Sequence, residues 1–225
     1  MVLSAVRRAR QAGRVAAAVG RYGVLPLRLA REAITGWGAI QRTWELTSLL
    51  GLARRQKPGV VMEIGTHRGG TLAALARVAR PDAFLLSLDM HTWPMGPEPS
   101  WPADEARIRA AMLPAQRMVA LRMDSHQAET KAAVESALAG RAVDFLFIDG
   151  DHTYGGVCRD WEMYVPLVRS GGLVAFHDIH YNPEDPVSQV DRFWRETRSR
   201  FRHWEFIDQD FPGGQGMGIG VLQIP

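Results

Sequence analysis

Short apolar runs recur along the chain from about residue 58, and most of them end in an acidic residue or a histidine-aspartate pair. The runs cover residues 60–64, 84–88, 118–123, 143–148 and 172–176. Stretches with helical spacing of apolar residues fill the intervals, at 71–79, 104–112, 127–138 and 154–168. This alternation predicts a parallel sheet with helices on both faces.

The end of the chain has a different pattern. After a predicted helix over 188–200, apolar runs at 203–207 and 217–223 flank a glycine-rich segment over 210–216, which predicts an antiparallel hairpin. We therefore expect an α/β fold: a Rossmann-like, doubly wound, mostly parallel sheet with a C-terminal antiparallel hairpin. Residues 1–57 are expected to form a helical cap, and residues 58–225 one domain. An insert rich in proline and tryptophan over 91–102 is either a lid beside a ligand or a stiff surface loop.

The net charge of +3 over 225 residues conceals an uneven distribution. Residues 1–57 carry ten arginines and one lysine against two glutamates, whereas the remainder has 16 basic and 22 acidic residues. We favour a solvated helical cap, with a basic amphipathic helix on an anionic membrane, or a transit peptide, as alternatives. No apolar run is long enough for a membrane span, and the single Cys158 favours a reducing compartment. We expect a cytoplasmic protein, with attachment to the membrane surface as a second option.

The first apolar run leads into a glycine-rich turn, Glu63-Ile64-Gly65-Thr66-His67-Arg68-Gly69-Gly70-Thr71. Glycine in a turn at a helix start lets the backbone approach a ligand closely. The spacing is neither the Gly-x-Gly-x-x-Gly dinucleotide motif nor a Walker loop. Asp89, at the end of the second run, is placed to accept hydrogen bonds from ribose hydroxyls. A nucleoside with little or no phosphate fits this turn better than a pyrophosphate.

Acidic and histidine side chains collect after two further runs. Asp149 ends one run and is followed by His152, and His177 and Asp178 end the next. Ligands bind at the carboxyl ends of parallel strands, so we expect the two aspartates to converge on one cation. A lone histidine in such a turn is more often a helix cap or a satisfied polar side chain. The pairing with two aspartates favours a general base at His152.

With these motifs the chain resembles the class I S-adenosylmethionine-dependent methyltransferases. Within them it is most similar to metal-dependent O-methyltransferases of the catechol type and to enzymes that methylate sugar hydroxyls in bacterial natural products and glycans. The resemblance covers about residues 58–223 and is most specific at 147–152 and 171–178. It implies S-adenosylmethionine as cofactor. The implied cofactor-binding residues are Glu63, Gly65, His67, Gly69 and Thr71 for the methionine part, Asp89 for the ribose, Met90, Asp124 and Ser125 for the adenine, and Asp149.

The resemblance also implies a divalent metal, Mg²⁺ or Mn²⁺, with Asp149 as its first ligand and His152 as the base. That family usually has two acids, or an acid and an amide, at the end of the fifth strand, where this chain has His177 and Asp178. Imidazole is a poor ligand for Mg²⁺ and a good one for Mn²⁺, Fe²⁺ or Zn²⁺. The expected ligands are Asp149, His177 and Asp178, and either His177 lies outside the coordination sphere or the metal is not magnesium.

One functional hypothesis follows: a metal-assisted O-methyltransferase that moves a methyl group from S-adenosylmethionine to a hydroxyl of a small polyol, sugar or glycosylated natural product. His152 and Asp149 are its expected catalytic residues. The alternatives are an NAD-dependent oxidoreductase, which would lack its usual phosphate turn, and a methyltransferase-like nucleotide-binding protein without turnover. We expect a small-molecule hydroxyl acceptor, no nucleic acid partner, and a homo-oligomer. An N-terminal helical extension often mediates dimers in the enzymes that the chain resembles.

Overall fold

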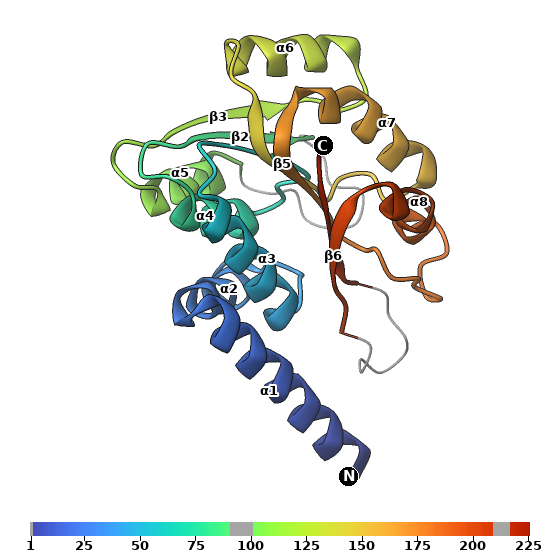
Figure 1. Ribbon diagram of the computed structural model, residues 1–225. Coiled ribbons are helices and arrows are strands. Elements are labelled where there is room, and N and C mark those ends of the chain that lie inside the picture. Colours follow the sequence, from blue (N-terminus) through green and yellow to red (C-terminus); the bar gives the residue numbers. More distant parts are fainter. Residues whose placement is uncertain (1, 91–100, 209–216) are drawn as a thin grey trace.

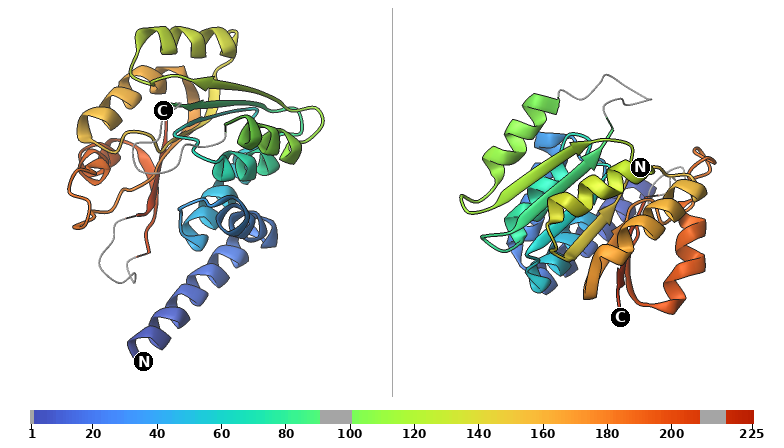
Figure 2. Two further views of the ribbon diagram at one scale, coloured as in Figure 1. Left: turned by 180° about the vertical axis from the view of Figure 1, so that it is seen from behind. Right: turned by 90° about the horizontal axis from the view of Figure 1, so that it is seen from above.

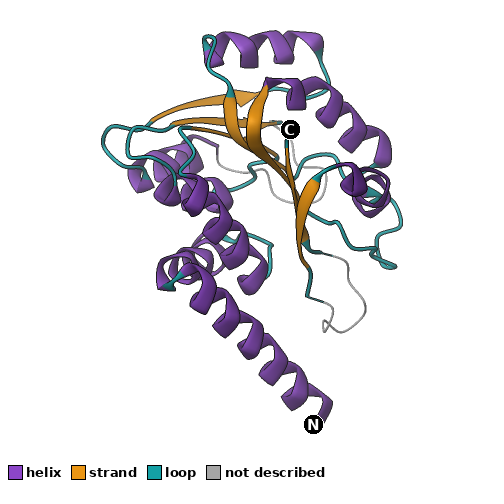
Figure 3. Ribbon diagram, in the orientation of Figure 1, coloured by secondary structure: helices purple, strands orange, loops and turns teal. Residues whose placement is uncertain are grey.

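One sheet forms the centre of the computed structural model, which describes residues 2–90, 101–208 and 217–225 (Figures 1 and 3). Within this described part the sheet has seven strands in the order β3-β2-β1-β4-β5-β7-β6. The first five strands run parallel, and β7 runs antiparallel to both β5 and β6. The strands are β1 Val60–Ile64, β2 Phe84–Asp89, β3 Arg117–Arg122, β4 Val143–Ile148, β5 Val168–Phe176, β6 Arg202–Phe206 and β7 Ile219–Gln223. The predicted fold class is confirmed.

The central strands β1, β2 and β4 are nearly continuous apolar runs because helices cover both faces of the sheet (Figure 2). Alternate residues of a strand point to opposite faces, so Val61 packs into one core and Met62 into the other. The helices that contribute to the first core are α2 Val24–Trp37, α3 Thr43–Gln56, α4 Gly70–Val78 and α5 Trp101–Ala111. Those of the second core are α6 Ala128–Leu138, α7 Tyr154–Tyr164 and α8 Val190–Thr197.

Two predicted helices are shorter than expected. The helix expected over 154–168 ends at Tyr164, and a short 3-10 turn, Val165–Leu167, follows it before β5 begins at Val168. Pro166 accounts for the break, because proline lacks the amide hydrogen that the helix needs. The helix expected over 188–200 is α8 followed by the 3-10 turn Arg198–Arg200. The insert over 91–100 and the glycine-rich turn at 210–216 lie outside the described residues.

The N-terminal helices continue the first core. Leu29 of α2 and Leu46 of α3 are buried in the same cluster as Phe145 of the sheet. The helix α1 Val2–Tyr22 begins at the N-terminus, and its N-terminal end points away from the sheet (Figure 1). No helix among the described residues is long and apolar enough to cross a membrane. The domain boundary at residue 58, membrane attachment and self-association through α1 stay predictions.

Candidate active site

The carboxyl ends of β1, β4 and β5 meet at one edge of the sheet. Beyond the last paired strand residues, the amide of Asp149 donates to the carbonyl of Ile64 at 2.9 Å, and the amide of His177 donates to the carbonyl of Ile148 at 3.2 Å. These bonds extend the strand pairing by one residue on each side. The first residue after β4 and the first after β5 therefore stand next to each other and next to the turn that begins at Gly65.

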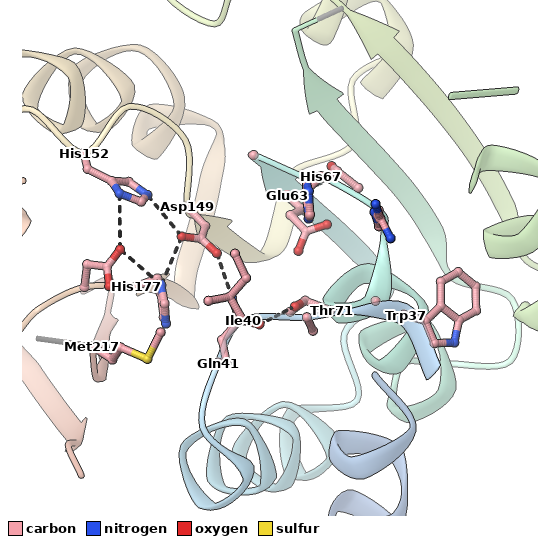
Figure 4. Close-up of a pocket in the computed structure, with 16 residues that line it drawn as sticks. Trp37, Ile40, Gln41, Glu63, His67, Thr71, Asp149, His152, His177 and Met217 are labelled. Carbon is pink, nitrogen blue, oxygen red and sulfur yellow. Dashed lines mark hydrogen bonds and ion pairs between the residues drawn. The ribbon is translucent and has the colours of Figure 1, made fainter. Parts of the chain in front are cut away.

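Two aspartates and two histidines form a tight cluster at this edge (Figure 4). The ring nitrogens Nε2 and Nδ1 of His152 lie 3.4 Å from Asp149 Oδ1 and 3.3 Å from Asp178 Oδ2. The Nδ1 atom of His177 lies 3.2 Å and 3.3 Å from the same two oxygens. Asp149 Oδ1 and Asp178 Oδ2 therefore each face both imidazole rings. The structure brings together all four residues that the sequence singled out here.

Charge pairing dominates the protonation of this cluster. Burial favours the neutral form of Asp149, but the charge of His177 and the hydrogen bond to His152 act more strongly and lower its pKa. Burial also lowers the pKa of His152, whereas the hydrogen bond and charge of Asp149 raise it by more, so the net pKa of His152 is raised. The pKa of buried His177 is raised well above its ordinary value because Asp178 and Asp149 outweigh the burial. The raised pKa values favour the charged imidazoles beside Asp149, so binding of a divalent ion would require the loss of imidazole protons.

The donor set suits a divalent cation that accepts both oxygen and nitrogen ligands. One ligand atom each from Asp149, His152 and Asp178 lie within 4.8 Å of one another. The position of His177 Nδ1, facing both carboxylates, adds a fourth donor. Mixed imidazole and carboxylate ligands favour Mn²⁺, Fe²⁺ or Zn²⁺ over Mg²⁺.

The glycine turn after β1 packs against the end of β4 without room for a side chain. A Cβ atom on Gly65, whose φ is +83°, would lie 1.9 Å from the carbonyl oxygen of Asp149. A Cβ atom on Gly69, whose φ is +81°, would lie 2.3 Å from the side chain of Ile108. The backbone amides of His67 and Met90 donate to the two carboxylate oxygens of Asp89 at 2.6 Å and 2.7 Å. Asp89 therefore fixes the turn, and each of its oxygens keeps a second lone pair for another donor.

Glu63 is a buried carboxylate with an unused oxygen. Its side chain lines the cavity beside Gly65, and 1% of the residue is exposed. Its Oε2 atom has no hydrogen-bond partner among the described residues. Burial and the nearby charges of Asp149 and Asp89 raise the pKa of Glu63 well above its usual range. A cationic ligand group beside Oε2 would relieve this unfavourable environment.

Three predicted adenine contacts do not line this cavity. Met90 is 45% exposed at the end of β2. Asp124 accepts hydrogen bonds from the amide of His126 and the side chain of Gln127, both at 2.9 Å, and so supports the start of α6. The carbonyl of Ser125 accepts a hydrogen bond from Tyr164. Among the described residues, the cavity is lined from β1, α4, β4, β5 and the cap instead, and the adenine role of these three residues stays a prediction.

The cap supplies site residues that the sequence analysis did not identify. Trp37 lines the cavity from the end of α2, Ile40 and Gln41 line it from the loop between α2 and α3, and Met217 lines it from before β7. Glu45, in the first turn of α3, is fully buried, and its charge acts on His177. No local motif marks the cap residues, because they reach the site through tertiary packing of the cap on the sheet.

Comparison with known proteins identifies the family. Residues 62–179, just over half of the chain, match the model of a family described as "Methyltransferase domain". In curated sequences, a 36-residue stretch is 47% identical to the uncharacterized protein R132 of Acanthamoeba polyphaga mimivirus, covering 16% of this chain and 16% of that protein. The chain thus spans about one sixth of that relative.

Solved structures share the fold at low sequence identity. TomG of Streptomyces achromogenes, an O-methyltransferase solved with S-adenosylmethionine, is 19% identical, with a TM-score of 0.56 and coverage of 89% of this chain and 90% of that one. An O-methyltransferase of Bacillus cereus, solved with S-adenosylhomocysteine, is 16% identical, with a TM-score of 0.60 and coverage of 87% and 90%. The calicheamicin methyltransferase CalS11 is 17% identical, with a TM-score of 0.54 and coverage of 88% and 91%. The family match begins within β1 and ends just after Asp178, so it includes both the turn after β1 and the Asp/His cluster that line the cavity. Since it covers just over half of the chain, the chain belongs to the methyltransferase-domain family.

Proposed function

We propose that this chain is a metal-assisted O-methyltransferase that uses S-adenosylmethionine and a small hydroxyl compound. The observation that carries the proposal is the cluster of Asp149, His152, His177 and Asp178 beside the glycine turn of a methyltransferase domain.

The turn after β1 suits the methionine part of S-adenosylmethionine. The unused Oε2 of Glu63 supports binding of the ammonium group, since a buried carboxylate gains most from a paired cation. Gly65, Gly69 and Thr71 keep the turn narrow and polar, and Asp89 is available to the ribose. These residues would bind and orient the cofactor.

Methyl transfer to oxygen is an in-line displacement, so alignment of the reacting groups and removal of the hydroxyl proton are the main tasks. When bound, S-adenosylmethionine supplies an electrophilic methyl group, and a divalent ion held by Asp149, Asp178 and His177 supplies Lewis acidity. The raised pKa of His152 would fall beside a bound cation, and a ring nitrogen of His152 would then accept the proton of the acceptor hydroxyl. Asp149 and Asp178 then stabilise the imidazolium that forms.

A small sugar or natural product is the acceptor class that we propose. CalS11, which shares the fold, is described as a TDP-rhamnose 3'-O-methyltransferase, and TomG takes part in tomaymycin synthesis. The half-exposed Ile40 and the nearby Met217 offer apolar surface next to the cluster, and Trp37 offers more at the end of the cavity beyond the turn (Figure 4). Such surface suits the apolar face of a sugar or an aromatic ring.

Transfer of a labelled methyl group from S-adenosylmethionine to a panel of nucleotide sugars and vicinal diols tests this function. We expect turnover by the wild type in Mn²⁺, its loss on chelation, and a decrease in kcat of roughly 10²- to 10⁴-fold in His152→Ala with retained affinity for S-adenosylhomocysteine. His203→Ala, on the exposed strand β6, is the matched control. Full turnover by His152→Ala would exclude it as the base, and tight cofactor binding without transfer to any acceptor would favour the binding-only alternative.

A further inference from the structure

Gln41 connects the cofactor turn to the candidate metal ligands. Its Nε2 atom donates a hydrogen bond to Asp149 Oδ2 at 2.8 Å, and its Oε1 atom accepts one from the Thr71 hydroxyl at 3.0 Å. The residue is 5% exposed, and Figure 4 shows it between the acidic cluster and the turn. One side chain from the cap therefore contacts both halves of the site.

The chemistry of the two partners fixes the orientation of the Gln41 amide. A carboxylate that binds a metal only accepts hydrogen bonds, and Asp149 Oδ2 lies 2.8 Å from the Gln41 amide. The NH₂ group must therefore face Asp149, and the amide oxygen then faces the Thr71 hydroxyl, which can donate. A primary amide serves both partners at once, whereas a carboxylate or an apolar side chain of similar length cannot.

The loop that carries Gln41 is held firmly on α4. Gly38 ends α2 in the left-handed conformation with a φ of 74°, and the amide of Ala39 donates to the carbonyl of Ala33 at 3.0 Å. The end of α2 and the loop lie so close to the start of α4 that a Cβ atom on Gly70 would be 2.9 Å from Cβ of Trp37 and 3.2 Å from Cβ of Ala39. The distance between the Gln41 backbone and Thr71 is therefore set by packing.

The hydrogen bond from Gln41 decides which oxygen of Asp149 faces the cluster. Because Oδ2 is bound to the amide, Oδ1 is the oxygen that faces His152 and His177. Partners behind a metal ligand fix its rotation and commonly strengthen metal binding.

We propose that Gln41 is a positioning residue that orients Asp149 for the metal and couples metal binding to cofactor binding through Thr71. The inference rests on the proposed function, because it takes Asp149 as a metal ligand. Coupling of this kind is reciprocal: Mn²⁺ should strengthen the binding of S-adenosylhomocysteine by the same factor by which S-adenosylhomocysteine strengthens the binding of Mn²⁺.

Calorimetric titration of the full chain with Mn²⁺, and with S-adenosylhomocysteine in the absence and presence of Mn²⁺, tests the proposal without turnover. We expect Gln41→Leu to weaken Mn²⁺ binding by roughly 10- to 100-fold. Thr71→Val keeps the contact between Gln41 and Asp149, so it should retain Mn²⁺ affinity while the effect of Mn²⁺ on S-adenosylhomocysteine binding declines. Gln41→Ala serves as a second variant if the leucine disturbs folding.

Gln116→Leu is the matched control. Gln116 is also buried, at 4% exposure, and its amide nitrogen donates to the carbonyls of Ala76 and Arg80 away from the cavity. This variant should lower the melting temperature and leave both affinities unchanged. Unchanged Mn²⁺ affinity in folded Gln41→Leu or Gln41→Ala would overturn the positioning role of Gln41 and leave the proposed function standing. A wild type that binds no Mn²⁺ would contradict the metal site of the proposed function, and this inference with it.

Discussion

Replacement of Gly65 by alanine tests whether the turn after β1 and the end of β4 form one site. Gly65 has a φ of +83°, a conformation that L-residues rarely adopt. Its added Cβ atom would lie 1.9 Å from the carbonyl oxygen of Asp149 and 2.8 Å from the amide nitrogen of Gly150. Real Cβ atoms essentially never approach a heavy atom to within 3.0 Å, so the two segments must separate by about 1 Å.

The expected loss of stability has two parts. A left-handed alanine costs about 1–2 kcal/mol relative to glycine. Overpacking of a close contact adds about 1–3 kcal/mol, so we expect the free energy of unfolding of Gly65→Ala to decrease by about 2–5 kcal/mol. The displacement of Asp149 by about 1 Å should also weaken Mn²⁺ and S-adenosylhomocysteine binding, because both depend on the position of this turn.

Gly140→Ala is the control for the cost of placing alanine in a left-handed backbone conformation. Gly140 has a φ of +79°, and its Cβ would meet no atom within 4 Å, so only the loss of about 1–2 kcal/mol applies. Guanidinium unfolding measures both free energies, and calorimetry measures ligand binding by both variants. Equal stability and equal ligand affinity in the two variants would refute the close packing of Gly65 against Asp149.

Two further predictions concern charge in the site. The pKa of Glu63 is raised in the folded state, so the wild type loses stability as the pH rises above about 4.5, where the unfolded chain ionises first. Glu63→Gln cannot ionise, so its stability relative to the wild type should increase over this range. The variant should also bind S-adenosylhomocysteine more weakly. Unfolding free energies measured across this pH range check the sign, and a difference independent of pH would contradict it. His177→Asp should shift metal preference from Mn²⁺ toward Mg²⁺, since it replaces an imidazole by a hard oxygen ligand. Competition titrations with the two ions measure the ratio, and an unchanged ratio would place His177 outside the coordination sphere.

The sheet and its functional edge could be predicted because they depend on local pattern. Apolar runs that end in Asp89, Asp149 or His177 specify both a buried parallel strand and a polar carboxyl end. Once β4 and β5 are neighbours, pairing brings Asp149 beside His177, and the left-handed backbone of Asp178, whose φ is 57°, completes the cluster. The family match over residues 62–179 confirms the predicted resemblance to methyltransferases.

The contribution of the cap could not be predicted in the same way. Gln41 lies in a loop without a motif, and its contact with Asp149 joins residues 108 positions apart. The position of this loop depends on how α2 and α3 pack on α4, which no local periodicity encodes. The early end of α7 had a local signal in Pro166, which the apolar spacing of the surrounding residues outweighed in the sequence analysis.

The central claim is that one cavity combines a cofactor turn at Glu63 and Gly65 with a metal site at Asp149 and Asp178. A crystal structure with S-adenosylhomocysteine and Mn²⁺, with anomalous scattering measured at the manganese edge, tests it most directly. We predict an anomalous peak between the carboxylates of Asp149 and Asp178, and the amino group of the cofactor beside Glu63. A cofactor bound in this way with no manganese at the two aspartates, or with manganese elsewhere, would contradict the proposed metal-assisted reaction.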